Sequence, residues 1–239
     1  MHGSDGERER LTFMSDVKTR ESQYQFLLDH EKEGLEQLGL MSSQVWRDDP
    51  RRLLFVLARY KFVAKMFSGL GKVCEVGCAD AFGTRIVRQE VKEVVATDFD
   101  PVFITRNQQH QHPRWNIQFE VHDMMAGPLA RGFDGIYAVD VIEHIPAEQE
   151  DRFVTNLAQS LNDAGICLLG TPSLQSQAYA SAPSKEGHVN CKDAPGLRAL
   201  MAKYFNNIFI FSMNDEVVHT GFHPMAHYLW ALCCHRKKT

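Results

Sequence analysis

The segment of residues 72–101 constrains the fold of this chain most strongly. A short apolar run at residues 73–76 leads through a loop of small residues to Gly83, and a second apolar run ends at Asp98. A helical pattern lies between the two runs, so the segment predicts a strand, a glycine-containing turn, a helix and a second strand. In open α/β sheets ligands bind at the carboxyl ends of the strands, where an acid can hold the hydroxyls of a ribose.

The loop after the first predicted strand argues against a dinucleotide ligand. A dinucleotide fingerprint requires glycines at two positions after Gly77 that are Ala79 and Phe82 in this chain. Glu75 would repel a pyrophosphate, but it suits a cofactor that carries a cationic amine and a sulfonium. An alanine at position 79 is tolerable only if its φ angle is negative.

The pattern E-x-G-x-x-x-x-x-G from Glu75 to Gly83, followed by an acid after the second strand, resembles class I S-adenosylmethionine (SAM) dependent methyltransferases. The resemblance extends to residues 121–123 and 137–145 and departs from the commonest form at Ala79, where a second glycine is usual. It implies an α/β fold with a Rossmann-like, seven-stranded, mostly parallel sheet, helices on both faces and an antiparallel last strand. It also implies that SAM is the cofactor.

The same resemblance implies which residues bind the cofactor. Asp98 would bind the ribose hydroxyls, the loop and Glu75 would bind the methionine part, and Asp123 would accept a hydrogen bond from the adenine amine. Asp123 has the alternative role of capping its own loop. The predicted cofactor-binding set is Glu75, Gly77, Cys78, Ala79, Asp80, Gly83, Asp98, Phe99, Asp123, Met124 and Asp140, with Phe99 and Met124 flanking the adenine.

Residues 140–146 follow the fourth predicted strand, and the topology places them beside the methyl group of the cofactor. His144 is the side chain of this segment whose ordinary pKa lies near neutrality. It is therefore our candidate for the general base that takes the proton of a hydroxyl acceptor. The alternative is that His144 only hydrogen-bonds to the backbone or packs against the cofactor.

The methyl acceptor is inferred by exclusion. The N-P-P-Y or D-P-P-Y motif of nucleic-acid amino-methyltransferases is absent, and Glu143 alone does not make the paired glutamates of protein-arginine enzymes. A small molecule remains, and a hydroxylated one, such as a sugar or sugar nucleotide, best fits the polar connection at residues 171–193. That connection predicts either a binding loop or a simple surface excursion. The candidate substrate contacts are Tyr179, Lys185, His188, Asn190 and Phe222.

Three other functions stay open at this point. One is an N-methyltransferase of a small amine or amino sugar, and another is a non-catalytic SAM-binding module, because fold does not fix function. The third is an NAD-dependent oxidoreductase, which the loop spacing and Glu75 disfavour.

No metal is expected. His219, His223 and His227 stand four residues apart, but a glycine and a proline between them interrupt any helix that could align them. The fifth predicted strand ends at residues 170–172 without an acid, which speaks against a magnesium-assisted mechanism.

Composition sets the outer bounds. The 239 residues are 44% apolar, which suits one sizeable domain, and a net charge of −4 argues against a general nucleic-acid binder. No apolar run approaches the ~18 residues that cross a bilayer, and the first residues lack a signal peptide, so we expect a cytoplasmic protein without a membrane partner. The six cysteines are expected to be buried, unpaired thiols.

The chain is expected to begin with a helical extension at residues 1–69, ahead of a SAM-binding core at residues 70–239. One imperfect helix is predicted within residues 16–38, and a second is predicted from the N-cap Asp49 to a stop at Gly69. In the family such an extension often packs over the cofactor cleft. The first helix could equally cover a sheet edge or a partner subunit, which leaves a homodimer open.

Overall fold

The computed structural model describes residues 17–130 and 132–238. The chain forms two units, Met1–Leu38 and Gly39–Thr239. The described part of the first unit contains the 3-10 turn η1 (Ser22–Tyr24) and helix α2 (Gln25–Glu33), which ends at Gly34 with a φ of 99°. The helix predicted within residues 16–38 is therefore confirmed in its described part, and it breaks at the glycine.

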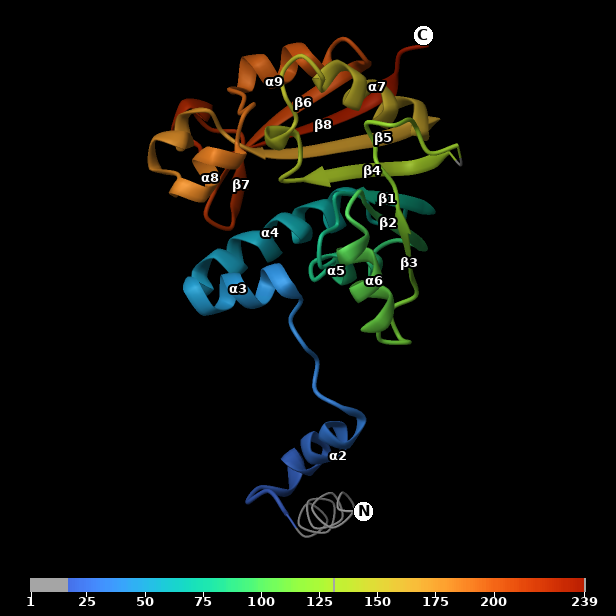
Figure 1. Ribbon diagram of the computed structural model, residues 1–239, viewed down its shortest axis with the longest axis vertical. Coiled ribbons are helices and arrows are strands. Elements are labelled where there is room, and N and C mark those ends of the chain that lie inside the picture. Colours follow the sequence, from blue (N-terminus) through green and yellow to red (C-terminus); the bar gives the residue numbers. More distant parts are fainter. Residues whose placement is uncertain (1–16, 131, 239) are drawn as a thin grey trace. The chain divides into compact units, whose positions relative to one another are not determined.

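The second unit is a single sheet with helices on both faces (Figure 1). Its helices are α3 (Leu40–Asp48), α4 (Pro50–Met66), α5 (Thr84–Arg88), α6 (Pro101–Gln109), α7 (Glu150–Ser160), α8 (Ala182–Gly187) and α9 (Ala194–Met201). Its strands are β1 (Lys72–Val76), β2 (Glu93–Asp98), β3 (Ile117–Val121), β4 (Phe133–Val139), β5 (Leu161–Pro172), β6 (Phe205–Asn214), β7 (Val217–His219) and β8 (Tyr228–Arg236). Three 3-10 segments complete it, namely η2 (Ile142–His144), η3 (Gln175–Tyr179) and η4 (His223–Met225).

The sheet has the strand order β3-β2-β1-β4-β5-β8-β6-β7. Strands β1 to β5 are parallel, and β8 runs antiparallel between β5 and β6. This confirms the Rossmann-like, mostly parallel sheet with helices on both faces. The sheet has eight strands rather than seven, because the chain turns back after β6 and pairs β7 with it.

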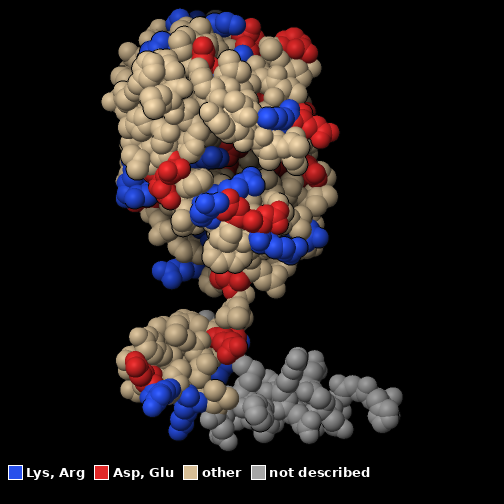
Figure 2. Space-filling model, turned by 90° about the vertical axis from the view of Figure 1, so that its left-hand side faces the viewer, with Lys and Arg blue, Asp and Glu red and all other residues tan. Residues whose placement is uncertain are grey.

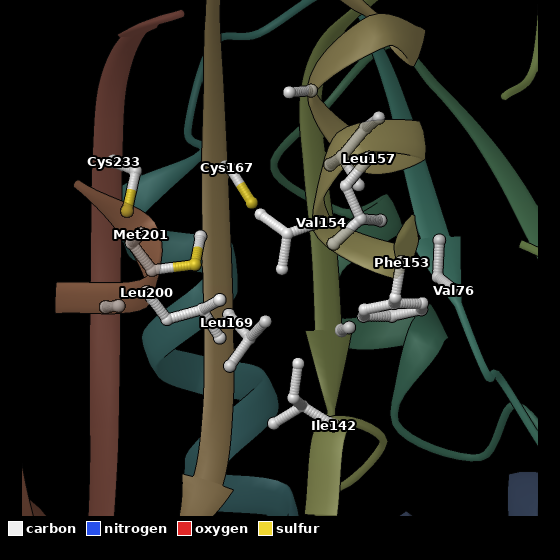
Figure 3. Close-up of a cluster of buried hydrophobic side chains, with 14 of the residues drawn as sticks. Val76, Ile142, Phe153, Val154, Leu157, Cys167, Leu169, Leu200, Met201 and Cys233 are labelled. Carbon is white, nitrogen blue, oxygen red and sulfur yellow. The ribbon is translucent and has the colours of Figure 1, made fainter. Parts of the chain in front are cut away.

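The central strands are buried on both faces. In β4, Ile136 and Ala138 belong to one hydrophobic cluster, whereas Tyr137 belongs to the other. Figure 3 shows the first cluster, in which side chains of α7 and α9 pack against β5. The residues labelled there are Val76, Ile142, Phe153, Val154, Leu157, Cys167, Leu169, Leu200, Met201 and Cys233. Such two-sided burial is typical of parallel strands that helices cover.

Helix α4 begins as its sequence predicts. Asp49 caps it by accepting a hydrogen bond of 3.3 Å from the N–H of Arg51, and Pro50 follows at the first helical position.

Helix α3 precedes α4, so two helices of the larger unit, rather than one, lie ahead of β1. The sequence did not indicate α3 because its large apolar side chains are exposed, and Ser42 is its buried residue. Both helices belong to the unit that contains the sheet. The two units meet between Leu38 and Gly39, whereas the sequence placed the start of the core after residue 69.

The cysteines are unpaired, as expected. Cys74, Cys78, Cys167 and Cys233 are buried, and Cys191 and Cys234 are half-buried. Among the described residues, no helix combines the length and apolarity needed to cross a membrane.

Candidate functional site

The predicted cofactor-binding residues follow the ends of β1, β2, β3 and β4, and the ends of these strands lie on the side of the molecule that faces the viewer in Figure 2. On this face, lysine and arginine side chains are interspersed with aspartate and glutamate rather than gathered into one basic surface. The cofactor loop, defined here as residues 77–83, connects β1 to α5 at this edge. The edge is where ligands bind in open α/β sheets.

Glu75 lies beneath the cofactor loop and is 1% exposed. Its Oε1 accepts a hydrogen bond of 2.7 Å from Tyr60, and its Oε2 accepts bonds from Thr84 at 2.5 Å and Tyr137 at 2.8 Å. Burial raises the pKa of Glu75 to about 7, against the lowering effect of these donors. From the sequence pattern, this carboxylate is expected to face a cationic cofactor. The structure instead surrounds it with hydroxyl donors from α4, α5 and β4, so that it holds the base of the loop.

Gly83 makes one of these contacts possible. A Cβ atom at this position would lie 2.2 Å from Cδ2 of Tyr60, which is closer than non-bonded atoms approach. The absence of a side chain therefore lets the Tyr60 ring reach Glu75. In this structure Gly83 contributes close packing at the end of the loop.

The cofactor loop has a strained backbone. Gly77 has a φ of 75°, and Ala79 and Ala81 have φ angles of 45° and 51°. The condition of a negative φ at position 79 is thus not met, because Ala79 adopts the left-handed region. Left-handed conformations cost alanine roughly 1 to 2 kcal/mol each, and such strain is concentrated at functional sites. The side chain of Cys78, which precedes Ala79, is buried in the same hydrophobic cluster as Ala81.

Asp98 joins the cofactor loop to the end of β2. Its Oδ2 accepts a hydrogen bond of 2.9 Å from the N–H of Ala79, and its Oδ1 accepts one of 2.9 Å from the N–H of Asp100. A carboxylate offers about four acceptor positions, so each oxygen keeps one for a further donor. Phe99 follows with 73% of its surface exposed. The carboxylate and the exposed ring thus fit the ribose and the base of a nucleoside.

Asp80 connects the same loop to α3. It accepts a hydrogen bond of 2.7 Å from the N–H of Ser42, in the first turn of that helix. A Cβ atom at Gly39 would lie 2.2 Å from Cβ of Asp80, so the helix start approaches the loop as closely as a glycine allows. Asp80 therefore caps α3 as a side chain from outside the helix.

The residues predicted to contact adenine differ in exposure. Asp123 is exposed, and its Oδ1 accepts a hydrogen bond of 2.8 Å from the N–H of Met125. This bond is the loop-capping contact kept as the alternative, and it leaves the second oxygen open. Met124 is 3% exposed and lies in the core. Of the two residues predicted to flank the adenine, Phe99 and Met124, Phe99 is therefore the exposed one.

Asp140 stands at the end of β4 with a φ of 58°. Its Oδ2 pairs with Nη1 of Arg59 at 2.5 Å, and the Arg59 guanidinium lies 4.0 Å from the centre of the Tyr228 ring. Arg59 is not predictable as a site residue from the sequence, because an arginine within a helix gives no signal of a partner that is distant along the chain. This ion pair links α4 to the strand end that carries the predicted reaction centre.

His144 is exposed, and its Nδ1 lies 2.8 Å from the carbonyl oxygen of Gly187. The His188 ring lies beside it, with centroids 5.2 Å apart. Glu143, fully buried, joins the two histidines, and one ligand atom from each residue lies within 4.8 Å of the others. Among the described residues this is the one group of histidine, cysteine, aspartate or glutamate side chains close enough to hold a metal ion.

The other predicted substrate contacts are not part of this group. Tyr179 is 92% exposed and Phe222 is 71% exposed. The grouping of Glu143 with the two histidines is not predictable from the sequence, because His188 lies in a connection whose path the residue pattern does not define. The adjacent glutamate and histidine after β4 were the available signal.

Comparison with known proteins assigns the fold and these residues to a class. A family profile described as a methyltransferase domain matches residues 45–206, which include the cofactor loop, Asp98 and the Glu143–His144 pair. The chain therefore belongs to this methyltransferase domain family. It is a class I SAM-dependent methyltransferase, and SAM is its cofactor.

Several solved structures share the fold. The N-methyltransferase NodS from Bradyrhizobium japonicum WM9, in complex with S-adenosyl-L-homocysteine (SAH), is 19% identical with a TM-score of 0.60, over 81% of this chain and 91% of that one. A DhpI–SAH complex is 13% identical with a TM-score of 0.60, over 82% of this chain and 92% of that one. The small RNA methyltransferase HEN1 is 12% identical with a TM-score of 0.62, over 76% of this chain and 25% of that one.

A search of curated protein sequences found no match. The structural likenesses are distant, and they extend across enzymes with different acceptors. They support the fold and leave the acceptor to be argued from the site.

Proposed function

We propose that this methyltransferase transfers the methyl group to a hydroxyl of a small polar acceptor, such as a sugar or sugar nucleotide. The observation that supports an oxygen acceptor is the position of His144 at the end of β4. Its Nδ1 faces a carbonyl oxygen, which only accepts hydrogen bonds, so Nδ1 carries a proton. In the neutral ring Nε2 then has a free lone pair, and it can take the proton that a hydroxyl acceptor must lose.

The cofactor is proposed to lie between the cofactor loop and Asp98. Asp98 would bind the ribose hydroxyls through its two remaining acceptor positions, and Phe99 would cover one face of the adenine. The loop backbone would contact the methionine part of SAM. Glu75 would support the loop through its hydrogen bonds with Tyr60 and Thr84. When bound, SAM supplies an electrophilic methyl group on a sulfonium, which suits direct transfer to an oxygen held about 3 Å away.

The acceptor is proposed to bind beside η2 and the connection that carries α8. The rings of His144 and His188 lie beside each other there, and the exposed Tyr179 and Phe222 are further candidate contacts. The interspersed charges of this face favour a small polar molecule over a nucleic-acid backbone, which selects a continuous basic surface.

A two-stage experiment tests this proposal. Calorimetric titration with SAH first measures cofactor binding, and transfer from methyl-labelled SAM is then measured with matched pairs of acceptors that differ only in a hydroxyl or an amine. We expect transfer to the hydroxyl member of a pair. Transfer restricted to amines would replace O-methylation by N-methylation, and SAH binding without transfer to any acceptor would indicate a non-catalytic SAM-binding module.

His144→Phe separates the role of the histidine from cofactor binding. We expect SAH affinity to change little, because His144 lies beyond the cofactor loop, and turnover to fall by about 100-fold or more, as for loss of a general base. Unchanged turnover would remove His144 from the mechanism.

A further inference from the structure

The group formed by Glu143, His144 and His188 has the donor set of a metal site. Glu143 and His144 are adjacent in η2, and His188 caps the end of α8. The two segments are joined by the N–H of Asn190, which donates to the carbonyl oxygen of Glu143 at 3.0 Å. Two imidazoles with one carboxylate are a recurring ligand set for divalent transition metals at catalytic sites.

Each imidazole is held by a hydrogen bond at one ring nitrogen, as the imidazoles of metal-binding histidines usually are. Nδ1 of His144 lies 2.8 Å from the carbonyl oxygen of Gly187, and Nδ1 of His188 lies 3.0 Å from Oε1 of Gln177. Both oxygens only accept, so each Nδ1 donates and each Nε2 is left with its lone pair in the neutral ring. Ligating histidines nearly always donate their second ring N–H to an oxygen in this way.

The carboxylate of Glu143 lacks a full set of partners. The residue is fully buried, Thr171 donates to its Oε2 at 3.1 Å, and its Oε1 has no hydrogen-bond partner. An isolated buried carboxylate is costly unless it is neutralised, paired or bound to a metal. Arg59 is the nearby cation, and it already forms an ion pair with Asp140. A cation at the histidine cluster would satisfy Glu143 as well.

We propose that Glu143, His144 and His188 bind a divalent first-row transition-metal ion, with further coordination positions open to water and to the acceptor. Hard ions such as Mg²⁺ prefer all-oxygen surroundings, so the two imidazoles favour a softer ion such as Zn²⁺ or Co²⁺. The proposal differs from the expectation, drawn from the sequence, that the chain binds no metal.

The ion would give His144 a different part in the reaction. Resting on the proposed O-methylation, the acceptor hydroxyl would bind to the ion, which lowers the pKa of the hydroxyl and lets its proton pass to water. The oxygen would then form its bond to the methyl carbon while the carbon–sulfur bond breaks and leaves its electron pair on sulfur. In the loaded protein His144 would be a ligand, and the ion would replace it as the group that activates the hydroxyl.

Metal binding can be measured without any acceptor. The full chain, freed of metal by chelation, is titrated with Co²⁺ while the visible d–d absorption is recorded, and Zn²⁺ binding is measured by calorimetry. We expect one equivalent of Co²⁺ and a spectrum of mixed nitrogen and oxygen ligation. Loss of a residue that only hydrogen-bonds to a metal ligand typically lowers metal affinity by roughly 10- to 100-fold, and we expect Gln177→Ala to lower it within that range. His188→Ala removes a ligand itself and should lower the affinity by more.

Matched variants control for general effects. His110→Ala and Glu148→Gln change exposed residues outside the cluster and should bind Co²⁺ as the unaltered protein does. Because Glu143 is buried, Glu143→Gln is checked by circular dichroism, and its test is the loss of the Co²⁺-induced rise in melting temperature. Absence of the d–d bands, or equal Co²⁺ affinity in His188→Ala, would overturn the metal site.

The same samples separate this proposal from the proposed function. SAH binding and transfer to hydroxyl acceptors are measured with and without the ion. O-methylation that persists at its full rate in metal-free protein would refute the role of the ion while leaving the proposed function intact. Co²⁺ binding together with methyl transfer only to amines would support the metal site and refute the proposed O-methylation.

Discussion

The hydroxyl of Tyr60 donates a hydrogen bond of 2.7 Å to Oε1 of Glu75, and this contact joins the middle of α4 to the strand that leads into the cofactor loop. Both side chains are buried, so water cannot replace the bond if it is lost. Helix α4 also carries Arg59, which reaches the end of β4 through Asp140. Two successive residues of one helix thus hold the ends of the two strands that flank the proposed reaction centre.

Replacing Tyr60 by phenylalanine tests whether this bond stabilises the fold. The ring remains and the hydroxyl is lost, so the Glu75 carboxylate loses one donor while the core keeps its packing. We expect the free energy of unfolding to fall by about 1 to 3 kcal/mol, measured by urea denaturation. Tyr24→Phe, at an exposed position, is the control and should change stability little. Equal stability of the unaltered protein and Tyr60→Phe would show that the bond contributes nothing.

The raised pKa of Glu75 predicts a stability profile that depends on pH. Its pKa is about 7 in the folded chain and near 4.5 in the unfolded chain, so folding binds a proton between these values. The stabilising contribution of the neutral carboxyl is complete below about pH 4.5 and is lost as the pH rises through 7. Over this window the unaltered protein should lose about 3 kcal/mol relative to Glu75→Gln, which has no group to ionise there.

Urea unfolding of the two proteins between pH 5 and pH 8 measures this difference, because effects of other carboxylates cancel between them. Glu93→Gln, which changes an exposed acid at the start of β2, should instead run parallel to the unaltered protein. A constant difference between Glu75→Gln and the unaltered protein across the window would contradict the raised pKa.

The left-handed backbone of Ala79 predicts a stabilising substitution. Glycine reaches a φ of 45° without the clash that alanine suffers, so Ala79→Gly should stabilise the free protein by about 1 kcal/mol despite the entropy that glycine loses on folding. Ala202→Gly is the control, because Ala202 has a φ of −65° and glycine there should destabilise. Melting temperatures of both variants decide the point. A loss of stability at position 79 equal to that at position 202 would rule out strain in the loop.

The sequence predicted the elements whose signals are local. The strand, loop, helix and strand of residues 72–101 and the capped start of α4 depend on neighbouring residues, and the structure agrees with both predictions. The sequence did not predict α3. The large apolar side chains of this helix are exposed, and the helix contacts the cofactor loop through Asp80. The cluster of Glu143, His144 and His188 was also missed, because it depends on how a long connection folds back onto η2.

The role of Glu75 shows a further limit of sequence patterns. The carboxylate of Glu75, at the end of the first strand, was predicted to face the cofactor, but its three hydroxyl partners lie on α4, α5 and β4. Of these, Thr84 alone is close to it in the sequence. Without the tertiary contacts, a buried carboxylate that holds a loop looks the same as one that faces a ligand.

The proposed ribose contact at Asp98 yields the most direct prediction for the cofactor. Asp98→Asn keeps the size of the side chain, but it removes the negative charge and turns one acceptor into a donor that would face the N–H of Ala79 or Asp100. Charge-assisted hydrogen bonds contribute about 1.5 to 3 kcal/mol each, so the affinity for SAH should fall at least about tenfold. Calorimetric titration measures the affinity, and Glu93→Gln on the same strand should bind SAH as the unaltered protein does. Undiminished SAH affinity in Asp98→Asn, with its fold confirmed by circular dichroism, would place the ribose elsewhere and require another acid of this edge, such as Asp123, to hold it.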